Sequence, residues 1–166
     1  MKYCPQCAHE LHDMLIDGVD RRACPAAGCG FVHWNNPIPV VAGLVRHEGR
    51  YILARNAQWP AGMFSVITGF LEKNETPEGA ILRETREELG VRGRRAEFIG
   101  HFALPEFNQL IIAFAVEADG SLGLGDEIAE IKALSRSELE THDFGHLELT
   151  RNIVSSCLAH TGSPDS

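Results

Sequence analysis

Seven residues between positions 69 and 90 have the types and spacing to perform metal-assisted chemistry: Gly69, Glu75, Arg83, Glu84, Glu87, Glu88 and Gly90. Three of the glutamates stand at positions i, i+3 and i+4, so a helix would place their carboxylates on one face. Carboxylates crowded in this way repel one another unless a cation lies between them, and oxygen ligands favour Mg²⁺ or Mn²⁺. The stretch therefore predicts a divalent-metal site that can also hold substrate phosphates.

The surrounding sequence predicts the helix that would position these carboxylates. Thr76 is a good N-cap, and Pro77 suits the first helical position because the N–H that it lacks would have no helical partner there. Gly90 is typical of the end of a helix. Residues suited to an inward face recur at helical spacing between them: Ile81, Leu82, Thr85 and Leu89.

A solvated acidic helix is the alternative interpretation, because most runs of charge are solvated. The spacing favours a functional site, since seven specified residues at fixed offsets arise by chance in on the order of one chain in a million. Arg83 adds to this, because it lies four residues before Glu87 and could orient Glu87 or Glu75 by a charge-assisted hydrogen bond.

Four cysteines near the N-terminus have the spacing of a structural zinc site. Cys4 and Cys7 form one short pair, and Cys24 and Cys29 form a second. Two such pairs fit a tetrahedral Cys4 zinc ribbon, whose four protein ligands leave no coordination position open for catalysis. About thirty residues bury little core, so the metal would supply the folding energy. Disulfides are the alternative, which the absence of an export signal disfavours.

We expect residues 1–34 to form this ribbon, residues 35–160 a larger α/β domain, and residues 161–166 a disordered tail. Three histidines could each replace a cysteine ligand, but we expect them at the surface: His9, His12 and His33. The larger domain is predicted to contain strands and a closing helix: strands 39–47, 51–55, 64–68, 96–103, 110–118 and 128–134, and helix 147–160. The Gly-rich segment 119–125 is interpreted as a turn, because no helix follows it.

Composition limits the function further. The chain has 166 residues and a net charge of −8, which argues against a dedicated nucleic-acid binder. A phosphate-rich substrate is still compatible, because a bound metal reverses the local charge. One basic cluster, at positions 92, 94 and 95, is interpreted as a solvated turn rather than a phosphate clamp. Without a long apolar run or a signal-peptide core, we expect a cytoplasmic protein.

The pattern from Gly69 to Val91 resembles the Nudix box, GX5EX7REUXEEXGU, with every fixed letter matched. Thr85 departs from it, since the family usually has an aliphatic residue there, and we expect this side chain to point at the sheet. The resemblance extends from Pro37 to His160 and implies an α/β/α sandwich with a mixed sheet. Together with the ribbon, it indicates the branch of NADH pyrophosphatases and related FAD and ADP-ribose pyrophosphatases.

This resemblance implies a metal-dependent hydrolase that cleaves a diphosphate linked to a nucleoside. Glu84, Glu87, Glu88 and the carbonyl of Gly69 would bind Mg²⁺ or Mn²⁺. Arg83 and Glu75 would hold the helix and its preceding loop in place.

The attacking water needs a base, for which there are two candidates. Glu84 is one. Glu127 is the other, as a base or a metal ligand, because it lies where this branch supplies a late glutamate from a loop. A lone loop glutamate is otherwise usually just exposed.

Recognition of the nucleoside base is expected to use aromatic stacking. Phe70 matches the position at which NADH pyrophosphatases stack adenine, and Trp59, Phe64 and Phe107 are further candidates. Core packing is the alternative for each, and it is preferred for Phe64.

The substrate is less closely defined. NADH pyrophosphatases carry an SQPWPFP-like stretch where this chain has HFALPEFNQ at 101–109, which favours FAD or ADP-ribose. Hydrolysis of NADH, or removal of an NAD-type cap from RNA, is the alternative. A catalytically silent zinc-ribbon adaptor is a different class of function, and the intact set of carboxylates speaks against it. Ribbon-bearing relatives are often dimers, so a homodimer is expected.

Overall fold

The computed structural model describes residues 1–160, which fall into two compact units. The first unit is Met1–Pro37, and the second begins at Ile38. The boundary therefore follows Pro37 rather than Trp34. The predicted tail, residues 161–166, lies outside the described residues. Within the described part of the chain, no helix is long and apolar enough to cross a membrane.

The first unit is a small antiparallel sheet with three strands: β1 (His12–Ile16), β2 (Val19–Ala23) and β3 (Val32–His33). Its buried hydrophobic cluster contains Cys4, Leu11 and Cys24, with a few half-buried residues packed against them. So little apolar surface cannot hold a fold of this size, which fits the prediction that a metal ion contributes to its stability.

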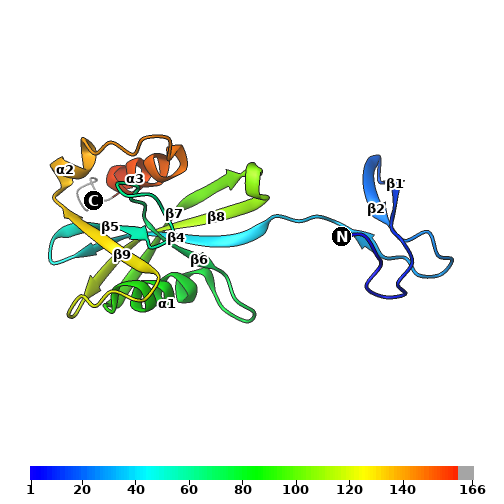
Figure 1. The fold of residues 1–166 in the computed structure, drawn as a ribbon, viewed down its shortest axis with the longest axis horizontal. Coiled ribbons are helices and arrows are strands. Elements are labelled where there is room, and N and C mark those ends of the chain that lie inside the picture. The colour runs from blue at the N-terminus through cyan, green and yellow to red at the C-terminus, as the bar shows by residue number, and fades with distance from the viewer. Residues whose placement is uncertain (161–166) are drawn as a thin grey trace. The chain divides into compact units, whose positions relative to one another are not determined.

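The second unit is built on a mixed six-stranded sheet (Figure 1). Its strands are β4 (Ile38–His47), β5 (Arg50–Asn56), β6 (Ile67–Phe70), β7 (Arg92–Leu104), β8 (Gln109–Asp119) and β9 (Ile128–Leu134). The order is β7-β8-β4-β5-β9, with β6 also paired to β4. Strands β4 and β8 are parallel, and the other pairs are antiparallel.

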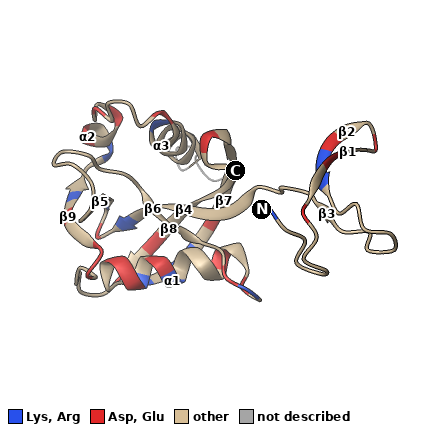
Figure 2. Ribbon diagram, turned by 45° about the vertical axis from the view of Figure 1, so that its right-hand side comes forward, with Lys and Arg blue, Asp and Glu red and all other residues tan. Residues whose placement is uncertain are grey.

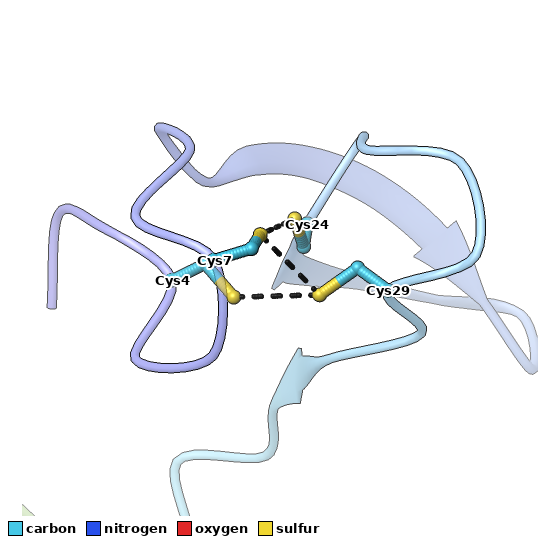
Figure 3. Close-up of side chains that lie close together, drawn as sticks. All are labelled: Cys4, Cys7, Cys24 and Cys29. Atoms are coloured by element: carbon cyan, nitrogen blue, oxygen red, sulfur yellow. Dashed lines mark hydrogen bonds between the residues drawn. The ribbon is translucent and has the colours of Figure 1, made fainter.

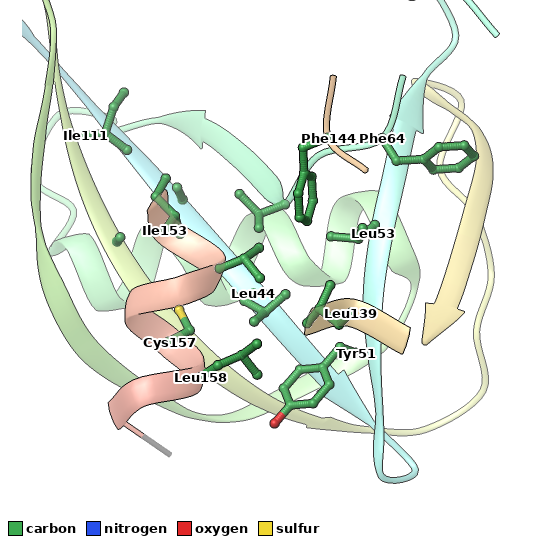
Figure 4. Packing of buried hydrophobic residues seen from close by; sticks show 14 of the residues in the cluster. Leu44, Tyr51, Leu53, Phe64, Ile111, Leu139, Phe144, Ile153, Cys157 and Leu158 are labelled. Carbon is green, nitrogen blue, oxygen red and sulfur yellow. The ribbon is translucent and has the colours of Figure 1, made fainter. Parts of the chain in front are cut away.

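Helices cover both faces of this sheet (Figure 1). On one face lies α1 (Pro77–Leu89), and on the other lie α2 (Arg136–Glu140) and α3 (Glu148–His160). The sheet has a buried hydrophobic cluster on each face: the α1 core, which includes Ile81, and the α3 core, which includes Ile153. Neighbouring residues of β4 face opposite clusters, since Val41 packs in the α1 core and Val40 and Leu44 pack in the α3 core (Figure 4). A strand buried on both faces explains why 39–45 is apolar without alternation.

Helix α1, which lies within the motif of residues 69–91 and is called the box helix below, begins and ends where the sequence predicts. Thr76 is the N-cap and its hydroxyl accepts the N–H of Gly79, Pro77 occupies the first turn, and Gly90 caps the C-terminus in the left-handed region at φ 69°. Thr85 is fully buried and donates its hydroxyl to the Ile81 carbonyl at 2.7 Å. Its predicted orientation toward the sheet is confirmed, and the back-bond satisfies the polar group that replaces an aliphatic side chain.

Two predictions about local structure were wrong, and one helix was not predicted. Strand 64–68 is displaced, because pairing with β4 begins at Ile67 and continues to Phe70. The basic cluster at 92, 94 and 95 begins strand β7 instead of forming a turn, and Arg94 is ion-paired with Asp119 of β8 at 3.0 Å. Helix α2 was not predicted, although Ser135 and Glu138 form a capping box at its start.

Candidate functional site

Arg83 joins the box helix to the loop before it. Its Nε and Nη2 donate to the two carboxylate oxygens of Glu75 at 2.9 and 3.0 Å. Its Nη1 donates to Glu84 and Glu87 at 2.7 and 2.9 Å, and Nη2 also donates to the Phe70 carbonyl at 3.1 Å. The bonds from Arg83 hold the pKa of Glu75 below its usual value. The spacing predicts that Arg83 orients Glu75 or Glu87, and in the structure Arg83 donates hydrogen bonds to both.

Glu84 lies directly over the backbone of Gly69. A Cβ atom on Gly69 would overlap the carboxylate of Glu84, so any larger residue at this position would force the Glu84 side chain to move. The Glu84 side chain is only 15% exposed. Strand β6 and helix α1 thus bring the predicted carbonyl ligand and the first of the three helix carboxylates together.

The pKa of Glu88 is raised well above its usual value, mainly by burial and then by its acidic neighbours. Burial, followed by repulsion from Glu84, Glu127 and Glu87, raises the pKa of Glu88 to about 8. Burial also raises the pKa of Glu84, against the opposing hydrogen bond from Arg83. Glu127 repels both carboxylates, so its side chain lies within the electrostatic field of α1. Much of the α1 ribbon is acidic (Figure 2).

The carboxylates of Glu84, Glu87 and Glu88 are close enough to repel one another, which a divalent cation would relieve, but their oxygen atoms are not gathered around one point. Among residues 1–160, only the four cysteines form a group of metal-ligating side chains with all ligand atoms close together. Glu84 and Glu87 are instead ion-paired with Arg83, and Glu87 is 52% exposed. A cation would relieve the repulsion on Glu88 and would share Glu84 and Glu87 with the guanidinium.

A cleft of about 930 Å³ lies on the other side of β6. Its walls include residues of the α3 core, such as Val40 and Ile153. Thr68 lines this cleft, whereas its neighbour Gly69 contacts Glu84 of α1. Because successive strand residues face opposite sides of a sheet, β6 lies between the cleft and the carboxylates of α1.

The cleft contains two of the predicted stacking residues. Trp59 and Phe107 line it, and Phe107 is 68% exposed. Phe70 is not among the lining residues and is 59% exposed, so its predicted place in the binding site is not supported by the cleft. Phe64 is 3% exposed and belongs to the core, as preferred.

Several residues of the cleft were not predicted as site residues from the sequence, including His101 and Phe102 of β7, the loop residue His146, and Glu148 and Asn152 of α3. His101 and Phe102 lie in the segment 101–109 that the sequence links to substrate choice, whereas no local motif marks the residues of α3, because β7 and α3 meet only in the folded chain. Among the lining residues, all of them in the described part of the chain, there is no lysine or arginine. Glu106 and Glu148 are its acidic members, so the cleft itself offers no positive charge beyond that of its histidines.

The four cysteines converge at the predicted zinc site (Figure 3). The sulfur atoms of Cys4 and Cys29 are 3.6 Å apart, those of Cys7 and Cys24 are 3.4 Å apart, and those of Cys7 and Cys29 are 3.5 Å apart. A tetrahedral zinc ion with bonds of about 2.3 Å would separate its sulfurs by roughly 3.8 Å. A disulfide would need about 2.0 Å, so the spacing fits a metal site better than disulfides.

The thiols in this cluster also have the electrostatics of a cation site. Burial would raise the pKa of Cys4, but backbone hydrogen bonds to Gln6 and Cys7 and those of the neighbouring thiols lower it to about 7. Burial, with contributions from the other thiols, raises the pKa of Cys24 to about 12. Four thiols at this distance cannot all ionise without a cation between them. His9 and His12 are exposed, as expected, and His33 is half-buried, outside the cluster.

Comparison with known protein families gives one match over most of the chain. The model described as the NUDIX domain matches residues 36–153. A solved structure, that of a NUDIX hydrolase from Nitrosomonas europaea, aligns with a TM-score of 0.77 and 27% identity, covering 99% of this chain and 95% of that chain.

Curated relatives share the name NAD-capped RNA hydrolase NudC. The protein of that name from Chromobacterium violaceum is 34% identical over 119 residues, which cover 72% of this chain and 43% of the relative. The one from Mycobacterium tuberculosis is 38% identical over 106 residues, which cover 61% of this chain and 34% of the relative. This chain therefore spans less than half the length of the curated relatives that it matches.

Proposed function

The chain belongs to the Nudix family, and on this premise we propose that it hydrolyses the diphosphate of an NAD-type dinucleotide, releasing a nucleoside monophosphate and a phosphorylated product. It is a Nudix hydrolase. The observation that supports the proposal most directly is the arrangement on β6, where Thr68 lines an aromatic cleft and Gly69 contacts Glu84. A dinucleotide that passes around β6 would have its diphosphate at the carboxylates of α1 and a nucleoside in the cleft on the opposite face of the strand.

Mg²⁺ or Mn²⁺ would be held by Glu84, Glu87, Glu88 and the carbonyl of Gly69. When bound, such ions neutralise the diphosphate, lower the pKa of a coordinated water and stabilise the leaving oxygen. Support for this ligand set comes from the repulsion that raises the pKa of Glu88 to about 8, which a cation would relieve. The close approach of Glu84 to Gly69 supports it as well.

The residues around this set have separate tasks in the proposal. Arg83 holds Glu75 by two hydrogen bonds and the Phe70 carbonyl by a third, so it keeps the end of β6 and the start of α1 in register. Glu84 or Glu127 accepts the proton of the attacking water. Burial keeps the pKa of Glu84 above its usual value, which suits a base that operates near neutral pH.

An NAD-type substrate is supported by the names of the relatives, whereas residues 101–109 alone favour FAD or ADP-ribose. The lining of the cleft agrees with an NAD-type dinucleotide. Its aromatic residues suit a flat ring, and the lack of lysine and arginine does not favour an additional phosphate. Removal of an NAD-type cap from RNA is the same reaction on a larger substrate, and the name of the relatives favours it as the second candidate.

Product analysis tests this proposal. Purified protein with Mg²⁺ or Mn²⁺ is incubated with NAD⁺, NADH, FAD, ADP-ribose and an NAD-capped RNA, and release of AMP, or of RNA with a 5′-monophosphate, is measured. We expect NAD-type compounds to be the best substrates. Equal or faster cleavage of FAD or ADP-ribose would transfer the proposal to those substrates, and no cleavage of any compound by metal-loaded protein would contradict it.

A further inference from the structure

The loop between β8 and β9 packs against the last turn of the box helix. The N–H of Gly123 donates to the Leu89 carbonyl at 2.9 Å, and the N–H of Gly125 donates to the Glu88 carbonyl at the same distance. Carbonyls in the last turn of a helix have no partner within the helix. The loop therefore supplies hydrogen bonds to the end of α1 that carries the acidic cluster.

Two glycines make this contact close enough. A Cβ atom on Gly125 would overlap the carbonyl oxygen of Glu87, and one on Gly90 would lie 2.7 Å from the Gly123 carbonyl oxygen. A Cβ atom on Gly123, by contrast, would meet nothing within 4 Å. The segment interpreted from sequence as a simple turn is thus docked, backbone against backbone, on α1.

The loop is also fixed at its two ends. At its start, Nε2 of His47, which is 6% exposed, lies 2.7 Å from the Gly120 carbonyl. A carbonyl can only accept a hydrogen bond, so Nε2 of His47 carries the proton. At its end, the carbonyl of Glu127 accepts the N–H of Ala57 at 2.8 Å.

We propose that this docked loop, residues 120–127, is a positioning device that sets Glu127 against the carboxylates of α1. Gly125 is hydrogen-bonded to the backbone of Glu88 and precedes Glu127 by two residues, so the docking of the loop limits the positions that the Glu127 side chain can occupy. Gly125 and His47 are then positioning residues for the reaction, although neither touches substrate. The inference rests on the proposed function, and it adds the means by which Glu127 is placed.

Two glycine variants in the same loop test this placement. Gly125→Ala must lift the loop away from Glu87, whereas Gly123→Ala has room for its methyl group and serves as the matched control. We expect Gly125→Ala to lower kcat about 10- to 100-fold with little change in KM, because small displacements of a reacting group have effects of that size. Mn²⁺ binding, followed by calorimetry without substrate, is expected to weaken in Gly125→Ala and to stay unchanged in Gly123→Ala.

A double-mutant cycle with Glu127→Gln separates positioning from general stability. If the loop acts by placing Glu127, Gly125→Ala has little further effect on kcat in the Glu127→Gln background. Full additivity would overturn the inference, as would a Glu127→Gln variant that keeps wild-type activity and Mn²⁺ affinity.

Two further outcomes are distinguishable. If Gly125→Ala does not fold, His47→Leu releases the other end of the loop, and it must show the same dependence on Glu127, while His47→Gln, which keeps a donor, restores part of the loss. If the wild-type protein hydrolyses no dinucleotide, the proposed function fails, but Mn²⁺ binding still decides the placement of Glu127, because equal affinities in Gly125→Ala and Gly123→Ala would overturn it.

Discussion

The Glu84 carboxylate rests against the backbone of Gly69, with no room for a side chain between them. This contact joins the end of β6 to the box helix at the point where metal would bind. Gly69→Ala therefore has to push Glu84 away, and we expect kcat to fall about 100-fold, since a displacement of about 1 Å at a reacting centre has an effect of that size. Steady-state kinetics with NAD⁺ and saturating Mn²⁺ measures it.

The control for this variant is Gly100→Ala in β7, where an added Cβ would meet only the Phe102 ring at ordinary contact distance, 3.7 Å. Circular dichroism is expected to show the same fold in both variants. Wild-type kcat in Gly69→Ala would mean that the position of Glu84 does not matter for the reaction.

The raised pKa of Glu88 predicts an unusual dependence of stability on pH. In the unfolded chain a glutamate titrates near 4.3, whereas in the folded protein the pKa of Glu88 is about 8. Between these values the folded state binds more protons than the unfolded state, so the free energy of unfolding falls as pH rises. We expect Tm of the metal-free protein to fall by about 2–8 °C between pH 5 and 8, if Glu88 contributes about 1–2 kcal/mol.

Thermal unfolding with and without metal checks this dependence. In Glu88→Gln the decline between pH 5 and 8 is expected to be smaller, because the titrating group is absent. Saturating Mn²⁺ is also expected to reduce the decline in the wild-type protein, because the cation stabilises the ionised carboxylate. A wild-type Tm that does not fall over this range would contradict the crowding at Glu88.

The cysteine cluster predicts that each chain binds one zinc ion and that this ion stabilises only the first unit. The core of Met1–Pro37 contains no residue of the second unit, and the two cores of the second unit contain no residue of the first. Chelation of zinc, or Cys7→Ser, is expected to unfold the first unit and to leave the main thermal transition in place. Metal analysis and calorimetry measure both effects.

Cys157→Ser is the control for zinc content, because Cys157 is 1% exposed in the α3 core of the second unit. It is expected to lower the main Tm while zinc stays at one per chain. Metal-free protein whose cysteines are paired as disulfides would contradict the zinc assignment.

Local signals in the sequence were enough to predict the box helix. Thr76, Pro77 and Gly90 decide its ends by capping chemistry that needs no distant partner. The same kind of signal was present at Ser135 and Glu138, where Ser-x-x-Glu marks the start of α2, and it was overlooked. The four cysteines were equally informative, because metal ligation restricts spacing strongly.

Features decided by tertiary pairing could not be predicted in this way. The bounds of β6 depend on which residues of β4 it meets, and β4 shares one edge between β6 and β5. The cleft depends on the meeting of β7 with α3, so His146 carried no signal, and the segment that contains His101 indicated substrate choice without locating the cleft. The docking of Gly125 on Glu88 depends on a close approach of two backbones, which a Gly-rich sequence permits but does not specify.

Trp59 and Phe107 are expected to bind a ring of the substrate. Stacking of a base on an aromatic side chain is worth about 1–3 kcal/mol, so Trp59→Ala or Phe107→Ala is expected to raise KM for NAD⁺ about 5- to 150-fold. Phe70→Ala is the informative comparison, because Phe70 is exposed and outside the cleft. A larger rise in KM for Phe70→Ala than for the cleft variants would restore the stacking role predicted for Phe70 from sequence.

The charge of the cleft predicts discrimination between NAD⁺ and NADP⁺, which differ by one phosphate. With Glu106 and Glu148 at the cleft and no lysine or arginine among its lining residues, an additional phosphate entering it meets repulsion. If the end of the dinucleotide that carries this phosphate occupies the cleft, kcat/KM for NADP⁺ is expected to be about 5- to 20-fold below that for NAD⁺ at low ionic strength. Glu148→Gln then narrows the difference, whereas Glu140→Gln on the neighbouring α2, outside the cleft, does not. Equal kcat/KM values in the wild-type protein would instead place the other end of the dinucleotide in the cleft, because only that end is identical in the two compounds.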